Sequence, residues 1–113
     1  SGRCEGDRII ERALRIMHDK PADPWTMDAL AQEVGASRAS LARRFQERVG
    51  ESPMTFLRNW RMALAADLLC QPDETVGSVA EKVGYATPFA FSAAFKRVRG
   101  VSPQAHREAA LCD

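Results

Sequence analysis

The stretch Val34–Pro53 reads VGASRASLARRFQERVGESP and decides the fold of the chain. Its apolar residues Leu41, Phe45 and Val49 recur every fourth position, which is the spacing of one buried face of an α-helix. Ser37 precedes them, and its hydroxyl can accept the free N–H groups of a first helical turn. The glycine after Val49 is a typical helix end. The sequence therefore predicts a short helix between Ser37 and that glycine.

The other faces of this helix carry Arg38, Ala39, Ala42, Arg43 and Gln46. Small residues among arginines suit a helix that inserts into a groove lined with phosphates. A solvated charged face, which most surface helices have, explains the same pattern. For this helix alone, both interpretations stay open.

The same pattern occurs a second time, because Val83–Pro103 reads VGYATPFAFSAAFKRVRGVSP. Phe45 and Gly50 of the first copy match Phe95 and Gly100 of the second copy. Matching residues lie 49 positions apart before the glycine turn and 50 apart after it, so the second turn has one additional residue. Each copy reads as a helix, a glycine turn and a second helix.

Further helices are marked by their capping residues. Thr26, Thr75 and Thr87 each stand before an apolar periodic stretch, where a short hydroxyl side chain favours a helix start. Another helix is expected to begin after Asp7, where an apolar stripe starts, and to end before Pro21.

A longer helix is expected after Ser52, because Pro53 suits the first helical position, where its missing N–H costs nothing. Its predicted apolar stripe consists of Phe56, Leu57, Trp60, Leu64, Leu68 and Leu69. About seventeen residues at ~1.5 Å each give a rod of roughly 26 Å. That rod, with the width of a helical unit at each end, can supply the ~34 Å between two reading helices on one face of B-DNA.

The chain has 113 residues, of which 45% are hydrophobic and 27% charged, as in ordinary globular domains. No apolar run reaches the length of a membrane span, and no signal peptide is visible. The expected division is 1–7 as linker or vector-derived residues, 8–52 as a first helix-turn-helix subdomain, 53–71 as a connecting helix, 72–110 as a second subdomain and 111–113 as a tail.

Positive charge is concentrated after each glycine turn, although the net charge is only +1. Residues 37–61 carry six basic and two acidic groups, and residues 96–107 carry four basic and no acidic groups. The intervening residues 62–95 carry one basic and four acidic groups. Such a distribution is the electrostatic pattern expected of a DNA-binding surface, with chance clustering as the alternative. Arg58 and Arg61 on the long helix could also reach phosphates, or be ordinary solvated arginines.

Little in the sequence indicates catalysis or metal binding. Cys4, Cys70 and Cys112 are odd in number and far apart, which excludes a closed set of disulfides and fits no zinc site; reduced thiols are expected. The two histidines, His18 and His106, lie in no metal or nucleophile signature, and no glycine-rich phosphate loop is present. The protein is therefore expected not to be an enzyme and to use no cofactor and no metal.

Two sequence motifs together resemble a known family. The first copy contains AxxxG followed by SxxxLxRxFxxxxGxSP, and the second contains AxxxGY followed by FSxxFKRxxGxSP and Arg107. From about Ile9 to Arg107 the chain resembles the DNA-binding domain of AraC/XylS-type bacterial transcription regulators. This resemblance implies an all-α fold of about seven helices, with two helix-turn-helix subdomains joined by a long central helix. It also implies sequence-specific binding of double-stranded DNA through two adjacent major grooves.

Site residues follow from the resemblance, position by position. The candidates for contact with DNA bases are Arg43, Ala39 and Ala42 in the first copy and Pro88, Phe89, Ala90 and Ala93 in the second. The candidates for contact with the DNA backbone are Ser37, Arg38, Ser40, Arg44, Arg58, Arg61, Thr87, Ser92, Lys96 and Arg97.

The second copy departs from the family's common pattern. Ala93 stands where an arginine is frequent, Phe89 where a polar residue is usual, and His106 where tyrosine is common. Alanine and phenylalanine cannot make bidentate hydrogen bonds to bases, so they offer van der Waals contact, as to the thymine methyl group. The first copy is therefore expected to specify the DNA sequence, while Lys96, Arg97 and Arg99 of the second mainly hold phosphates or pack. An ordinary solvated face is the alternative for Lys96 and Arg97. Packing in the core is the alternative for Phe89.

The expected function is bacterial transcription regulation, with activation as the expected mode and RNA polymerase as a protein partner. The expected location is the cytoplasm, at the nucleoid, without membrane contact. An effector-binding or dimerisation domain is expected to lie outside these residues. The alternative function is a helical protein-interaction module whose arginines meet an acidic partner. Affinity for DNA that falls steeply with salt would distinguish the two, because a pure protein adaptor would ignore DNA.

Overall fold

A computed structural model describes residues 2–111, with side chains from Arg8 onward. Within this range the chain forms seven α-helices and no strand, which confirms the predicted all-α fold. The helices are α1 (Gly2–Asp19), α2 (Met27–Val34), α3 (Arg38–Val49), α4 (Pro53–Leu69), α5 (Val76–Lys82), α6 (Pro88–Arg99) and α7 (Pro103–Leu111). None of these helices combines the length and the apolar character needed to cross a membrane.

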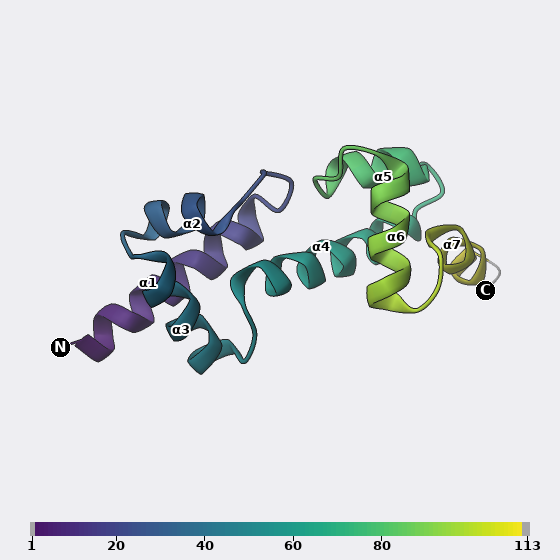
Figure 1. The fold of residues 1–113 in the computed structure, drawn as a ribbon. Helices are drawn as coiled ribbons and strands as arrows, with labels where there is room; N and C mark the ends of the chain where they lie inside the picture. Colours follow the sequence, from purple (N-terminus) through teal and green to yellow (C-terminus); the bar gives the residue numbers. More distant parts are fainter. Residues whose placement is uncertain (1, 112–113) are drawn as a thin grey trace. The chain divides into compact units, whose positions relative to one another are not determined.

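The chain divides between Arg58 and Asn59 into two compact units, each with its own core. In the first unit α1 packs against both α2 and α3, and in the second α6 contacts α5 and α7 (Figure 1). The first core contains Ile10, Ala13, Met17, Leu30, Ala31, Val34, Leu41, Phe45 and Leu57. The second core contains Met62, Ala65, Ala66, Leu69, Val79, Ala80, Val83, Phe91 and Phe95.

The two helix-turn-helix turns repeat the same backbone hydrogen bond. In the first turn the N–H of Ala36 donates to the carbonyl of Ala31 at 3.0 Å, and in the second Tyr85 donates to Ala80 at 2.9 Å. Gly35 stands in the first turn with φ of 72°, a left-handed conformation that glycine adopts without steric cost. The two acceptor residues, Ala31 and Ala80, are both buried. These contacts confirm the duplicated pattern read from the sequence.

The predicted caps are also confirmed. Each capping hydroxyl accepts a hydrogen bond from the backbone N–H three residues further on, at 3.0 to 3.1 Å: Thr26 before α2, Ser37 before α3, Thr75 before α5 and Thr87 before α6. Ser52 caps α4 in the same way at 3.3 Å. Because an N-cap fixes the first residue of a helix, these side chains determine where α2, α3, α4, α5 and α6 begin.

The start of α1 was predicted wrongly, since the helix begins at Gly2 rather than after Asp7. An apolar stripe shows where a helix starts to bury side chains, and among the side chains described, from Arg8 onward, the first buried one is Ile10. The backbone hydrogen bonds of a helix can extend beyond its apolar stripe, so the stripe does not fix the first helical residue.

The apolar stripe of α4 was predicted only in part. Leu57 and Leu69 are buried as expected, whereas Phe56, Trp60, Leu64 and Leu68 are half-buried. The buried residues missed are Met62, Ala65 and Ala66. With Leu69 these occupy one helical face at spacings of three and four, and they pack in the second core, while Leu57 packs in the first. The prediction of one continuous stripe was wrong because successive parts of α4 pack in two different cores.

Two side chains of the last helix, α7, bind it to the rest of the second unit. The Arg107 guanidinium donates to the carbonyl of Pro72 at 2.9 Å and to the carbonyl of Glu74. His106 Nε2 lies 3.0 Å from the carbonyl oxygen of Ala66, and its ring meets the Phe95 ring edge-on with centroids 5.5 Å apart. Because a carbonyl can only accept, Nε2 carries the hydrogen. His106 therefore joins α7 to α4.

Of the three cysteines, Cys70 is a free, exposed thiol whose Sγ lies 4.0 Å from His106 Nε2. The side chains of Cys4 and Cys112 lie outside the described residues.

Glu74 makes the stability of the second unit depend on pH. Its carboxylate accepts hydrogen bonds from Lys82 and, at 2.6 Å, from Ser78, and these bonds hold the pKa of Glu74 below its ordinary value of about 4.5. A lowered carboxyl pKa stabilises the folded state above the unfolded pKa, and this contribution is lost as the pH falls through the folded pKa. Glu74→Gln is therefore expected to lose less stability than the wild type between pH 5 and 3.

Urea denaturation at several pH values measures this difference. The matched control is Glu81→Gln, the same change at an exposed carboxylate of α5. Equal losses of stability on acidification in the wild type and in Glu74→Gln would contradict the prediction.

Candidate nucleic-acid interface

The outward side of α3 brings together the three residues predicted to contact bases in the first unit. Leu41 and Phe45 are fully buried and fix which side of α3 faces the core. Ala39 and Arg43 are exposed and Ala42 is half-buried. Their spacing of three and four residues places them on one side of the helix. The first unit therefore presents two methyl groups beside a guanidinium group.

Arg43 differs from the other arginines near it. Arg38 Nε pairs with Asp28 Oδ1 on α2 at 3.2 Å, and Arg44 Nε donates to Ser40 Oγ at 3.0 Å. Among the described residues, no side chain bonds or pairs with Arg43. Its five N–H donors are therefore available to an external acceptor, and guanidinium can bind a guanine edge or a phosphate through two bonds.

The backbone candidates at the start of α3 already have partners within the protein. The partners of Arg38, Ser40 and Arg44 are given above. Ser37 also has one, because its Oγ accepts a hydrogen bond from the N–H of Ser40. The hydroxyl of Ser37 keeps its own proton for donation, and the pair of Arg38 with Asp28 is exposed. Exposed ion pairs are weak, so a phosphate could replace Asp28 as the partner of Arg38.

The candidate DNA-contacting helix of the second unit, α6, has an apolar first half. Pro88, Phe89, Ala90 and Ala93 are all exposed, and Ser92 is half-buried. The side chain of Phe89 is 89% exposed, so the alternative in which it packs in the core is wrong. A large aromatic residue that folding leaves in water is available for contact with another molecule.

The basic residues of α6 lie in its last turns, away from this apolar half. Lys96, Arg97 and Arg99 are exposed there, near the helix C-terminus, whose dipole favours positive charge. The Oγ1 of Thr87 is the N-cap at the opposite end and accepts the N–H of Ala90 at 3.1 Å. Charge and apolar surface are thus separated along α6.

The two arginines predicted on α4 are both half-buried. The guanidinium carbon of Arg61 lies 5.9 Å from the centre of the Tyr85 ring. Partial burial lowers the pKa of Arg61 from its usual value, and Tyr85 raises it by a smaller amount. Arg58 buries its Nε without an acceptor in the described part of the chain. Both side chains are therefore partly engaged in packing, unlike Arg43.

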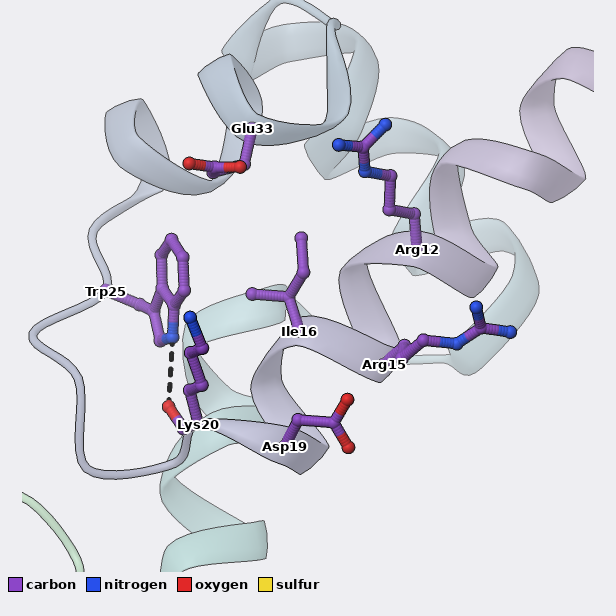
Figure 2. Close-up of a pocket in the computed structure, with 7 residues that line it drawn as sticks. All are labelled: Arg12, Arg15, Ile16, Asp19, Lys20, Trp25 and Glu33. Carbon is purple, nitrogen blue, oxygen red and sulfur yellow. Dashed lines mark hydrogen bonds between the residues drawn. The ribbon is translucent and has the colours of Figure 1, made fainter.

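A hollow of about 450 Å³ lies in the first unit between α1, the loop after it and α2. Figure 2 shows Trp25 and Ile16 there among side chains of both charges. The Trp25 Nε1 donates to the carbonyl of Lys20 at 3.1 Å, which fixes the indole. The charged lining residues are Arg12, Arg15, Asp19, Lys20 and Glu33. None of the lining residues belongs to α3, so this hollow is separate from the candidate base-contact residues.

The duplicated α2–turn–α3 and α5–turn–α6 arrangement defines a helix-turn-helix protein, and comparison with known proteins specifies the family. Residues 30–109 match the family model described as "Helix-turn-helix domain". Over 102 residues the chain is 41% identical to a protein of Streptomyces lividans whose name describes it as an AraC-like transcription regulator. That alignment covers 90% of this chain and 34% of the relative, so the chain spans about a third of the relative's length.

Comparison with solved structures indicates the same family as the sequence comparison. The C-terminal domain of the response regulator AraT from Geobacillus stearothermophilus superposes with a TM-score of 0.86 at 32% identity, covering 89% of this chain and 84% of that one. The DNA-binding domain of AdpA, solved in complex with a target DNA, gives a TM-score of 0.83 at 29% identity and covers 88% of this chain and 90% of that one. The chain belongs to the AraC-type helix-turn-helix family of transcription regulators.

Proposed function

We propose that this chain binds double-stranded DNA sequence-specifically and thereby regulates bacterial transcription. The observation that carries the proposal is the outward side of α3, where Arg43 has no partner among the described residues and stands beside Ala39 and Ala42. A helix with small side chains and one available guanidinium can enter the major groove and read a base edge. The AdpA domain, a structural neighbour, was solved with DNA bound.

The two units contribute unequally in this proposal. Arg43 supplies bidentate hydrogen bonding in the first unit, whereas α6 has Ala93 at the equivalent position. The first half of α6 supplies apolar contacts through Phe89, and Lys96 and Arg97 bind phosphates, which contributes affinity without sequence information. The first unit therefore specifies the site, and the second strengthens binding to it.

Other aspects of the regulator stay predictions. Activation, RNA polymerase as a protein partner, a separate effector-binding or dimerisation domain, and a location at the bacterial nucleoid are all expected from the family. The entry of α3 and α6 into adjacent major grooves is likewise expected from the family.

Selection of bound duplexes from a randomised DNA pool, followed by sequencing, tests the proposal. The expected result is two blocks of preferred sequence about one helical turn apart, with the stronger block under the first unit. Binding should weaken linearly in the logarithm of salt concentration. No enrichment and no salt-sensitive retention of any duplex would overturn the proposal and favour the protein-interaction module.

Phe89→Ala is expected to weaken binding to the selected site by up to about 1.5 kcal/mol, because DNA contact covers apolar surface that folding leaves exposed. Fluorescence anisotropy of the labelled duplex measures the change. The matched control is Ala109→Ser, at an exposed position of α7. Unchanged affinity of Phe89→Ala for the selected site would show that Phe89 does not touch the DNA.

A further inference from the structure

An apolar hollow of about 430 Å³ lies beside the candidate base-contact residues of α3. Three helices of the first unit contribute its walls: Met27 begins α2, Ala39 and Ala42 come from α3, and Pro53 and Met54 begin α4. The two methionines are flexible and polarizable, so they can adjust to the shape of an occupant. The hollow thus adjoins the helix that is proposed to read DNA.

The polar side chains that line this hollow are already paired within the protein. Arg38 Nε pairs with Asp28 at 3.2 Å. Ser52 Oγ donates to Thr55 Oγ1 at 2.9 Å and accepts the N–H of Thr55 at 3.3 Å. Because Arg38 Nε and Ser52 Oγ have partners and the other five lining residues are apolar, the walls of the hollow favour contact with an apolar group.

We propose that this hollow receives the C5-methyl group of a thymine, so that Ala39 and Ala42 select thymine at one position of the first unit's site. This inference rests on the proposed DNA-binding function. The edges of the bases in the major groove expose hydrogen-bonding groups, and the methyl group of thymine is the apolar group among them. The volume of the hollow admits the methyl group together with the adjacent ring edge.

The two copies differ in side-chain size at a position that lines the hollow in the first copy. Ala39 of α3 corresponds in the repeat to Phe89 of α6, which is 89% exposed. In the first unit the small side chain leaves a recess for a base substituent, whereas in the second the large side chain projects outward. Both arrangements use apolar contact, but only the first offers a recess for the methyl group, so thymine selection is assigned to the first unit.

Replacement of thymine by deoxyuracil tests the inference, because it removes only the methyl group. Each thymine of the selected site is replaced in turn, and the dissociation constant is measured for each duplex. One position is expected to lose about fourfold in affinity, which corresponds to ~0.8 kcal/mol for one buried methyl-sized group. This position should lie in the block of preferred sequence under the first unit.

The variant Ala42→Leu fills the hollow and is expected to bind the thymine and deoxyuracil duplexes equally. Ala109→Leu, the same change at an exposed position of α7, is the matched control and should keep the fourfold difference. Thermal unfolding of both variants checks that the fold is retained, and the wild-type measurement with deoxyuracil is informative without either variant.

The outcomes separate this inference from the function on which it rests. Sequence-selective binding without a methyl-sensitive thymine in the first block would overturn the inference and leave the proposed function intact. A methyl effect that persists in Ala42→Leu would place the methyl group outside the hollow and overturn the inference too. Absence of any selective binding would instead refute the proposed function itself.

Discussion

Phe45→Ala is expected to unfold the first unit, at a cost of about 3 to 5 kcal/mol in the free energy of unfolding. The Phe45 side chain is fully buried, and its ring meets the Phe56 ring edge-on with centroids 5.7 Å apart. Truncation leaves a cavity and removes this aromatic contact. A unit of fewer than 60 residues has little stability to lose, so most molecules should have an unfolded first unit.

The equivalent change in the second unit is Phe95→Ala, which removes a buried ring in contact with Phe91 and His106. We expect a loss of similar size there. Because the two units have separate cores, each substitution should act first on its own unit.

Urea denaturation followed by tryptophan fluorescence measures these losses. In a Trp60→Phe background the signal reports Trp25, which packs against the first core. Phe45→Ala should move this transition to much lower urea concentration. Phe89→Ala is the matched control, since it is the same change at an exposed position and should stay within about 0.5 kcal/mol of the wild type. An unshifted transition for Phe45→Ala would show that the first core does not depend on this ring.

Arg43→Ala is expected to cost about 1 to 3 kcal/mol of binding free energy on the preferred duplex and to relax the preference at one base pair. The side chain is exposed and has no partner among the described residues, so its removal leaves folding unaffected and removes only external contacts. A guanidinium bidentate to guanine O6 and N7 would produce this loss.

Dissociation constants on the preferred duplex and on duplexes with single base-pair changes measure the effect. Lys96→Ala is the comparison, because a phosphate contact should weaken binding to all sequences alike and lower the salt slope by about one. Arg15→Ala, at an exposed arginine of α1, controls for the loss of one positive charge. If Arg43→Ala weakened all duplexes equally, Arg43 would be a phosphate contact instead.

Most of the fold could be predicted from local features of the sequence. Capping hydroxyls such as those of Ser37 and Thr87, and the glycines that end α3 and α6, act within a few residues, so they are visible in the sequence. The repeat then indicated that both copies adopt the same turn, as the matching hydrogen bonds of Ala36 and Tyr85 confirm. The N-caps and the two turns, which depend on neighbours close in sequence, were therefore predicted correctly, whereas the start of α1 was not.

Features that depend on distant neighbours could not be predicted. The burial of Met62 and Ala66 follows from packing against the second core, not from any property of α4 alone. The apolar hollow was likewise invisible, because Met27 and Met54 come from separate helices that meet only in the folded unit. The helical spacing was enough to predict that Ala39, Ala42 and Arg43 share one side of a helix. It did not show that Arg38 and Arg44 have partners within the protein.

The separate cores of the two units have an evolutionary consequence. After the pattern was duplicated, a substitution in one copy could alter DNA contact there without repacking the other copy, because the described residues form two distinct buried clusters. Divergence of the exposed positions would then proceed at different rates in the two halves. The two copies already differ in this way, since Arg43 of the first copy corresponds to Ala93 in the second. New operator preferences can therefore arise by changing one half of the regulator at a time.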